Sequence, residues 1–424
     1  STLFPYTTLF RSWAFTALYA AVMAAMFWGA WAPDAAFIQP DQAIHHPVNE
    51  AAAFWKGFCE GGRFVPPDLV HSLGGMALWQ EAYYAIAAYL AALGLAYYLR
   101  GRGAGLFAQY AAGATYSLMG YNFTLYSAGH LGWFIFLMFG PWMFGLLDRA
   151  VRMEKWRHWI LLGAAVAWSS AQQPDIWLMF MILLCAYGAW CCVREKKFAR
   201  LLPKALAAFA VMLAAGMPQF IQAAGESAQS REKQIAETSA NGVATDEERW
   251  RFCTNWSLPP EDILEFFVPD IHGASSDPRI SPSNPYTGRL GMQIAPGKWQ
   301  PYRQHSLHFG FLTWVLLLGG LAVAAPKFKI KGETAFWAIA GAVALVCALG
   351  CFTPFYRLVY ALPYGSSVRC PVKFVHLVEW CVAALLGFSI DRLMKSKITG
   401  IPAAVCLLAA INISVMAQVD SRYF

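Results

Sequence analysis

Apolar runs of about twenty residues, long enough to cross the ~30 Å hydrocarbon core of a bilayer as helices, recur along this chain. Polar segments separate the runs, and only 13% of the 424 residues are charged. A typical soluble domain carries about 25% charged residues. The sequence therefore predicts an all-α integral membrane protein with about eleven transmembrane helices.

The predicted spans are given by the apolar runs alone. They cover residues 13–32, 78–99, 104–126, 129–147, 159–171, 176–193, 201–222, 306–325, 334–353, 371–390 and 399–418. The fifth run is short and ends in a polar turn at residues 169–175. It is expected to form a tight hairpin with the sixth.

Basic residues between the runs predict which face is cytoplasmic. If the spans alternate, seventeen Lys and Arg fall in short loops on one face, and the short loops near residues 128 and 172–175 have none. Short cytoplasmic loops carry an excess of Lys and Arg. Residues 33–77 and 223–305 are therefore expected to be extracytoplasmic. Because the net charge of +7 comes mainly from these clusters, we expect membrane lipids as partners and no nucleic acid.

The chain divides into a membrane region at 13–222, a long outer loop at 223–305 and a second membrane region at 306–424. Residues 1–12 read like a translated sequencing adapter, and the natural chain is expected to start at or before Trp13. The end at Phe424 is expected to be a truncation. Long loops such as 223–305 usually carry function or fold separately.

Three carboxylates in the first outer loop are candidate catalytic groups: Asp34, Asp41 and Asp68. A carboxylate beside a membrane surface can act as a general base or bind a metal. The alternative for each is a solvated loop acid.

Polar residues at the ends of spans are candidate substrate-binding groups. His130 lies between two glycines, and the Gln172-Gln173-Pro174-Asp175 turn opens a span. Asp175 could simply cap a helix, but polar groups at this depth are costly unless paired or used. Arg369 and Lys373 could hold a phosphate at a helix start or reach to the interface.

The ten cysteines show no metal-binding spacing. Most fall in apolar runs, where a thiol behaves as a small apolar side chain. Cys59, Cys253, Cys351 and Cys370 fall outside the spans or at their edges. For these four cysteines the sequence leaves two alternatives, a disulfide among them or buried thiols. No nucleotide-binding loop, zinc-protease helix or haem motif is present.

Several short stretches resemble the YfhO-like bacterial membrane proteins, which are placed among the GT-C-type glycosyltransferases. They are Asp41, Tyr116–Tyr121, Gly129-His130, the Gln-Gln-Pro-Asp turn, Trp250–Glu261 and Arg369–Phe374. The resemblance extends over nearly all of residues 13–390.

The resemblance implies an enzyme that transfers a sugar from a polyprenyl-phosphate donor to an envelope glycan or lipid acceptor, on the outer face of the bacterial cytoplasmic membrane. Asp41 is then the first candidate for the catalytic base, before Asp68 and Asp34. Arg369 and Lys373 would stabilise the leaving phosphate. No cofactor is assigned, and use of a divalent metal stays open because Gln42, not a second acid, follows Asp41.

Two other classes of function remain as alternatives. One is a transporter or flippase for a lipid or polysaccharide, although such proteins often contain inverted repeats that this sequence does not show. The other is a non-catalytic membrane scaffold that uses the 223–305 loop as a binding module.

Overall fold

The computed structural model describes most of the chain outside the first predicted outer loop. The described residues are 5–26, 76–122, 124, 131–170, 174–238, 245–274, 285–295, 298–300, 306–324, 332–362, 365 and 368–421. Over these residues the fold is almost entirely helical, with one short antiparallel hairpin of strands β1 (Met292–Ala295) and β2 (Lys298–Gln300).

Helices account for nearly every apolar run. They are α1 (Pro5–Met26), α4 (Met76–Gly101), α5 (Leu106–Ser117), α7 (Leu131–Met153), α8 (Trp156–Ser169), α9 (Pro174–Glu195), α10 (Phe198–Thr238), α11 (Asp246–Thr254), α12 (Phe311–Ala324), α13 (Glu333–Ala348), α14 (Tyr356–Tyr360), α15 (Val375–Met394) and α16 (Ile401–Ser421). Short 3-10 helices are η2 (Pro260–Phe266), η4 (Gly350–Phe352) and η6 (Pro371–Phe374).

Among the described residues, four helical segments are long and apolar enough to cross a membrane. They are Asp175–Glu195, Phe198–Pro218, Pro371–Met394 and Ile401–Val419. Shorter apolar helical stretches cover Trp13–Met26, Ala85–Gly101, Phe311–Val323 and Glu333–Ala348. These helices are compatible with a membrane protein, and each predicted span overlaps a helix.

The chain packs into two compact units that are not continuous in sequence. Unit 1 comprises Ser1–Pro141, Phe309–Lys329 and Leu386–Phe424, and unit 2 comprises Trp142–His308 and Ile330–Leu385. This division cuts across the segments drawn from the sequence, because those followed the expected sides of a membrane and not the packing.

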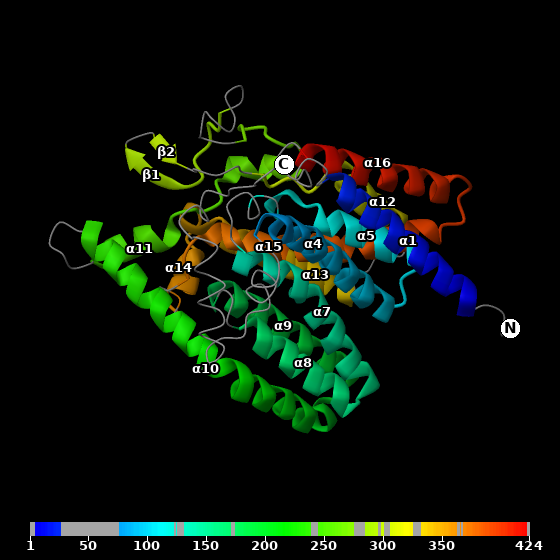
Figure 1. Cartoon of the computed structure of the whole chain (residues 1–424), viewed down its shortest axis with the longest axis horizontal. Coiled ribbons are helices and arrows are strands. Elements are labelled where there is room, and N and C mark those ends of the chain that lie inside the picture. Colours follow the sequence, from blue (N-terminus) through cyan, green and yellow to red (C-terminus); the bar gives the residue numbers. More distant parts are fainter. Residues whose placement is uncertain are drawn as a thin grey trace. The chain divides into compact units, whose positions relative to one another are not determined.

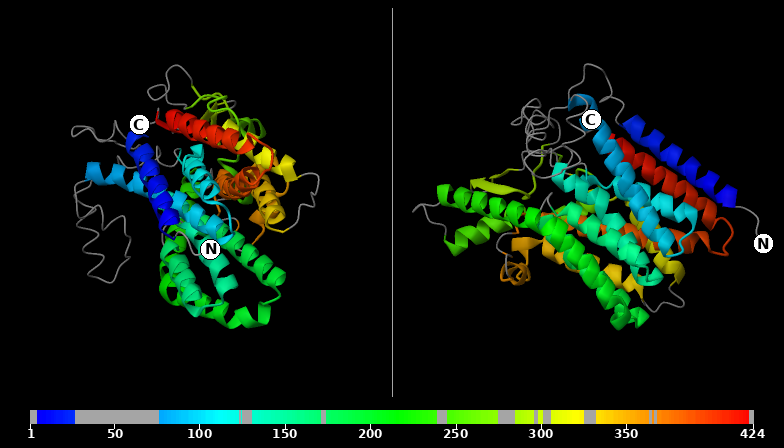
Figure 2. Two further views of the ribbon diagram at one scale, coloured as in Figure 1. Left: turned by 90° about the vertical axis from the view of Figure 1, so that its right-hand side faces the viewer. Right: turned by 60° about the horizontal axis from the view of Figure 1, so that its bottom comes forward.

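Unit 1 is a helical bundle in which small residues allow close contact. Helices α4 and α5 pack tightly, and a Cβ at Gly113 would lie 2.5 Å from the carbonyl oxygen of Ala92. Helix α16 runs alongside α1 and also packs on α5 and α12 (Figure 2). The Tyr19 hydroxyl of α1 is hydrogen-bonded to the Ser117 hydroxyl of α5, which joins the first helix to the bundle.

Helix α5 is shorter than the run at 104–126 suggested. It has twelve residues and ends at Ser117. Side chains take up the backbone acceptors at this end: Ser117 Oγ donates to the Ala114 carbonyl at 2.8 Å, and Asn122 Nδ2 donates to the Tyr116 carbonyl at 3.0 Å. Such local bonds compete with continuation of a helix.

Helix α10 is longer than predicted. It continues beyond residue 222 to Thr238, so the start of the expected outer loop is helical (Figure 1). Residues 223–238 are rich in Ala, Glu and Gln, which favour a helix without requiring burial.

The core of unit 2 is built from aromatic rings. Phe144 stacks on Trp380 with ring centroids 4.8 Å apart and meets Trp337 edge-on at 5.4 Å. Trp337 stacks in turn on Tyr187 at 4.9 Å, and the Tyr187 hydroxyl donates to Glu333 at 2.7 Å. Rings in such arrangements contribute attraction beyond their buried area. Helices α8 and α10 pack side by side in the same unit (Figure 1).

Candidate functional site

An ion pair between Asp175 and Lys373 lies at the centre of the candidate site in unit 2. Asp175 is in the first turn of α9, where its carboxylate also accepts a hydrogen bond from the Ile176 N–H at 2.9 Å. Lys373 is in η6, and its ammonium group donates to the Asp175 carboxylate. The side chains are only 13% and 6% exposed. Charges this buried need a partner, and here each has one.

The backbone around Lys373 is held to a second segment of the chain. The Cys370 N–H donates to the Cys253 carbonyl at 3.1 Å, and the Val372 N–H donates to the Trp256 carbonyl at 3.0 Å. Cys370 itself has a left-handed backbone with φ of 62°. The stretches Trp250–Glu261 and Arg369–Phe374 therefore lie side by side, although a hundred residues separate them.

The first of these stretches begins in α11, which has a complete capping box. Thr245 Oγ1 accepts from the Glu248 N–H at 3.2 Å, and the Glu248 carboxylate accepts from the Thr245 N–H at 2.7 Å. Such caps fix where a helix starts. The cap thereby sets the positions of the aromatic rings that α11 carries.

Two arginines stack on the aromatic rings of α11. The Arg369 guanidinium lies over Phe252 at 4.9 Å from the ring centroid, and the Arg357 guanidinium lies over Trp250 at 4.5 Å. Arg369 is half-buried and Arg357 is exposed. A stacked guanidinium keeps its hydrogen-bond donors at its edge. Arg369 is thus a cation positioned over α11, four residues before Lys373 in the chain.

The other end of the stretch is clamped to the end of α13. The Leu258 N–H donates to the Ala348 carbonyl at 2.8 Å, and the Cys351 N–H donates to Ser257 Oγ at 3.0 Å. A Cβ at Gly350 would lie 2.0 Å from Ser257 Oγ, so this approach requires glycine. The Trp250–Glu261 stretch, on which Arg369 stacks, is therefore held in place on both sides.

Acidic residues with polar partners lie at the end of this stretch. The Tyr286 hydroxyl donates to Asp262 at 2.6 Å, and the carboxylate of Glu261 accepts a forked pair of bonds from Arg289 at 2.6 and 2.8 Å. The hydrogen bond from Arg289 lowers the pKa of Glu261, while burial, together with Asp262, raises the pKa of Tyr286. These contacts hold residues 286 and 289 against residues 261 and 262.

Sequence reasoning did not single out His376 and Glu379, which lie one and two turns beyond Lys373. Both side chains are fully buried, and His376 Nδ1 is 3.2 Å from a Glu379 oxygen. Ionisable residues inside an apolar run are unusual and mark functional or paired positions. That rule, applied to the run at 371–390, would have identified them.

The structure describes three of the predicted site residues. Asp175 and Lys373 are brought together, and Arg369, four residues before Lys373, stacks on Phe252. The other predicted site residues, Asp34, Asp41, Asp68, His130 and Gln173, lie outside the described residues. Within the described part of the chain, no group of three or more His, Cys, Asp or Glu side chains could hold a metal ion.

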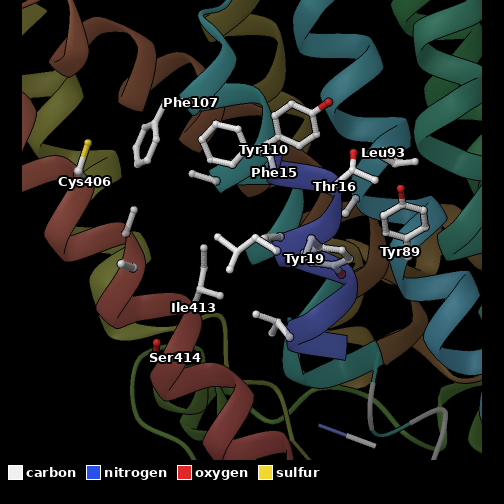
Figure 3. Close-up of a pocket in the computed structure, with 17 residues that line it drawn as sticks. Phe15, Thr16, Tyr19, Tyr89, Leu93, Phe107, Tyr110, Cys406, Ile413 and Ser414 are labelled. Carbon is white, nitrogen blue, oxygen red and sulfur yellow. The ribbon is translucent and has the colours of Figure 1, made fainter. Parts of the chain in front are cut away.

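A separate feature, in unit 1, is an apolar cavity of about 250 Å³ between α1, α4, α5 and α16. Five aromatic residues line it, and Phe15 stacks on Tyr110 with centroids 5.2 Å apart (Figure 3). Ile413 and Cys406 of α16 line the opposite side. The wall chemistry suits a hydrocarbon chain and offers few polar contacts.

Comparisons of the chain with protein-family models, curated proteins and solved structures found no significant match.

Proposed function

We propose that this chain is a multi-pass glycosyltransferase of the GT-C type, related to the YfhO-like proteins, with about eleven spans in a bacterial cytoplasmic membrane. It would transfer a sugar from a polyprenyl-phosphate donor to an envelope glycan or lipid on the outer face. The loops at 33–77 and 223–305 would then be extracytoplasmic.

The convergence of three stretches of the chain carries this proposal. The Asp175 turn, the Trp250–Glu261 stretch and the Arg369–Phe374 stretch come together in unit 2. Each was singled out in the sequence by the same family resemblance. Residues this far apart in a chain are brought together by the packing of unit 2, and their convergence there supports a shared site.

The cations in this site take different roles. Lys373 is bound to the buried carboxylate of Asp175, which neutralises it and makes it a positioning residue for η6. Arg369 is half-buried, and its guanidinium can present a fork of donors to a phosphate. In the proposed reaction Arg369 therefore binds the leaving phosphate.

The reaction is a direct displacement at the anomeric carbon. Asp41 would accept the proton of an acceptor hydroxyl while the acceptor oxygen bonds to that carbon. The bond from the carbon to the phosphate oxygen breaks, and polyprenyl phosphate leaves with its negative charge beside Arg369. General-base assistance typically gives a ~10²–10⁴-fold rate increase, and a positioned cation adds to it.

Arg369→Gln provides the test. Membranes that contain the chain are supplied with a panel of labelled polyprenyl-phosphate hexoses, and transfer of label to envelope acceptors is measured. Arg357→Gln is the matched control, because Arg357 also stacks on a ring of α11. We expect the Arg369 change to lower transfer by at least tenfold and the Arg357 change by less than threefold, in keeping with the loss of one charge-assisted contact. Equal effects, or no transfer by the unaltered chain from any donor, would count against the proposal.

The apolar cavity of unit 1 favours a second candidate function, movement of a lipid across the membrane. Ala410 lines this cavity, and Ala410→Trp should fill part of it. In proteoliposomes with a fluorescent phospholipid, a transporter would lose flipping activity on this change. A chain that moves no lipid with or without the tryptophan is not such a transporter.

A further inference from the structure

Cys253 and Cys370 are neighbours across the contact between the Trp250–Glu261 and Arg369–Phe374 stretches. The hydrogen bond from the Cys370 N–H to the Cys253 carbonyl measures 3.1 Å. A backbone bond of this kind holds two Cα atoms roughly 5–6 Å apart. That separation lies within the range that a disulfide spans.

Both cysteine side chains are buried. Cys253 is 2% exposed and Cys370 is 4% exposed. Burial raises the pKa of the Tyr356 phenol, and Cys253, Cys370 and Cys347 add to the effect.

The backbone of Cys370 is held in an unusual conformation at this contact. Its φ of 62° places a residue with a side chain in the left-handed region. Such a conformation persists only where the surroundings enforce it. The hydrogen bonds at 370 and 372 supply part of that constraint, and a bond from the Cys370 sulfur would complete it.

We propose that Cys253 and Cys370 form a disulfide in the native protein and thereby lock the Trp250–Glu261 stretch to η6. This inference uses the outward orientation that is part of the proposed function, because disulfides persist in oxidising compartments such as the bacterial periplasm. Both residues are thiols in the structure.

The oxidant would be a dithiol–disulfide oxidoreductase of the cell envelope, acting before the thiols are buried. One thiolate attacks a sulfur of the oxidoreductase disulfide, forms a mixed disulfide and releases a thiolate of the oxidoreductase. The second cysteine thiolate then attacks the mixed disulfide at the sulfur of the first. The products are the Cys253–Cys370 bond and the oxidoreductase in its dithiol form, so two electrons and two protons pass to the oxidoreductase.

The test is peptide mapping of the full chain. Cells are quenched in acid, thiols are alkylated, and the chain is digested with and without reduction. We expect a linked pair of peptides that contain Cys253 and Cys370, and we expect it to be lost in Cys253→Ser and in Cys370→Ser. Cys351→Ser is the matched control, because Cys351 is exposed and its N–H bonds to Ser257 of the same stretch. This change should leave the link intact. Alkylated Cys253 and Cys370 in the unaltered chain, or a link from either residue to Cys351, would overturn the proposal.

A second arm distinguishes a fault in the geometry from a fault in the orientation. The reduced chain is purified in detergent, unfolded, refolded in oxidised dithiothreitol and mapped in the same way. If cells give thiols but refolding gives the Cys253–Cys370 link, the assumed orientation is at fault. If neither gives the link, Cys253 and Cys370 are not placed to form a disulfide. The transfer assay with Arg369→Gln then still decides the proposed function separately.

Discussion

Removing one charge of the Asp175–Lys373 pair should destabilise the protein strongly. The two side chains are only 13% and 6% exposed, so solvent cannot take over the charge that remains. Loss of one partner from a buried pair typically raises the free energy of the folded state by about 3–5 kcal/mol. We expect this for Lys373→Met and for Asp175→Asn, and the asparagine keeps an oxygen that can accept from the Ile176 N–H.

The double variant measures the interaction between Asp175 and Lys373 apart from the contacts that each makes with other residues. Asp175→Asn with Lys373→Met removes both charges of the pair, so its loss should be smaller than the sum of the single losses by about 3 kcal/mol. The free energy of unfolding is measured by denaturant titration in detergent, with circular dichroism as the readout. The same cycle on Glu247 and Arg251, which are 61% and 75% exposed, should give a coupling of at most about 1 kcal/mol. Additive single losses at the buried pair would refute this reasoning.

Three further predictions address packing, titration and backbone conformation. Gly216→Ala should destabilise the protein by about 1–3 kcal/mol, because its Cβ would lie 2.7 Å from Ala167 Cα. Gly225→Ala in the same helix should stabilise it by about 0.4–1 kcal/mol, because its Cβ would meet nothing within 4 Å. Both changes in the free energy of unfolding are measured by denaturant titration. Because Arg289 holds the pKa of Glu261 below its ordinary value of 4.5, the stabilisation from ionised Glu261 is complete above pH 4.5 and is lost as pH falls through the lowered pKa. The melting temperature of Glu261→Gln should therefore lie below that of the unaltered chain at pH 6, and the difference should shrink toward pH 3; a constant difference would contradict this. Gly310→Ala should lower the melting temperature, because Gly310 has φ of 87° and an added Cβ would lie 2.6 Å from Asn412 Oδ1; an unchanged melting temperature would show that the site can relax.

The helices could be predicted well because each apolar run is long and uniform. The run at 176–193 lies within α9, and the run at 399–418 is nearly coextensive with α16. Predictions were less accurate where polar side chains decide the boundary. Ser117 and Asn122 bond to backbone carbonyls and accompany the early end of α5, and the polar part of α10 continues as a helix beyond its apolar run.

The candidate site could be predicted only in part. Asp175, Arg369 and Lys373 were each singled out from local patterns, but no local pattern indicates that Asp175 and Lys373, 198 positions apart, form a pair. Their pairing follows from the packing of unit 2, in which backbone bonds hold η6 against the segment after α11. It also changes the expected role of Lys373 from a phosphate ligand to a partner of Asp175.

The central claim is that the chain transfers a lipid-linked sugar on the outer face of the membrane, with Asp41 as the base. The most direct test is mass spectrometry of envelope glycans from cells that express the complete gene, either unaltered or with Asp41→Asn, at equal protein levels. The account predicts a sugar modification that is present with the unaltered gene and lost with the variant. The same glycans from both would contradict the claim.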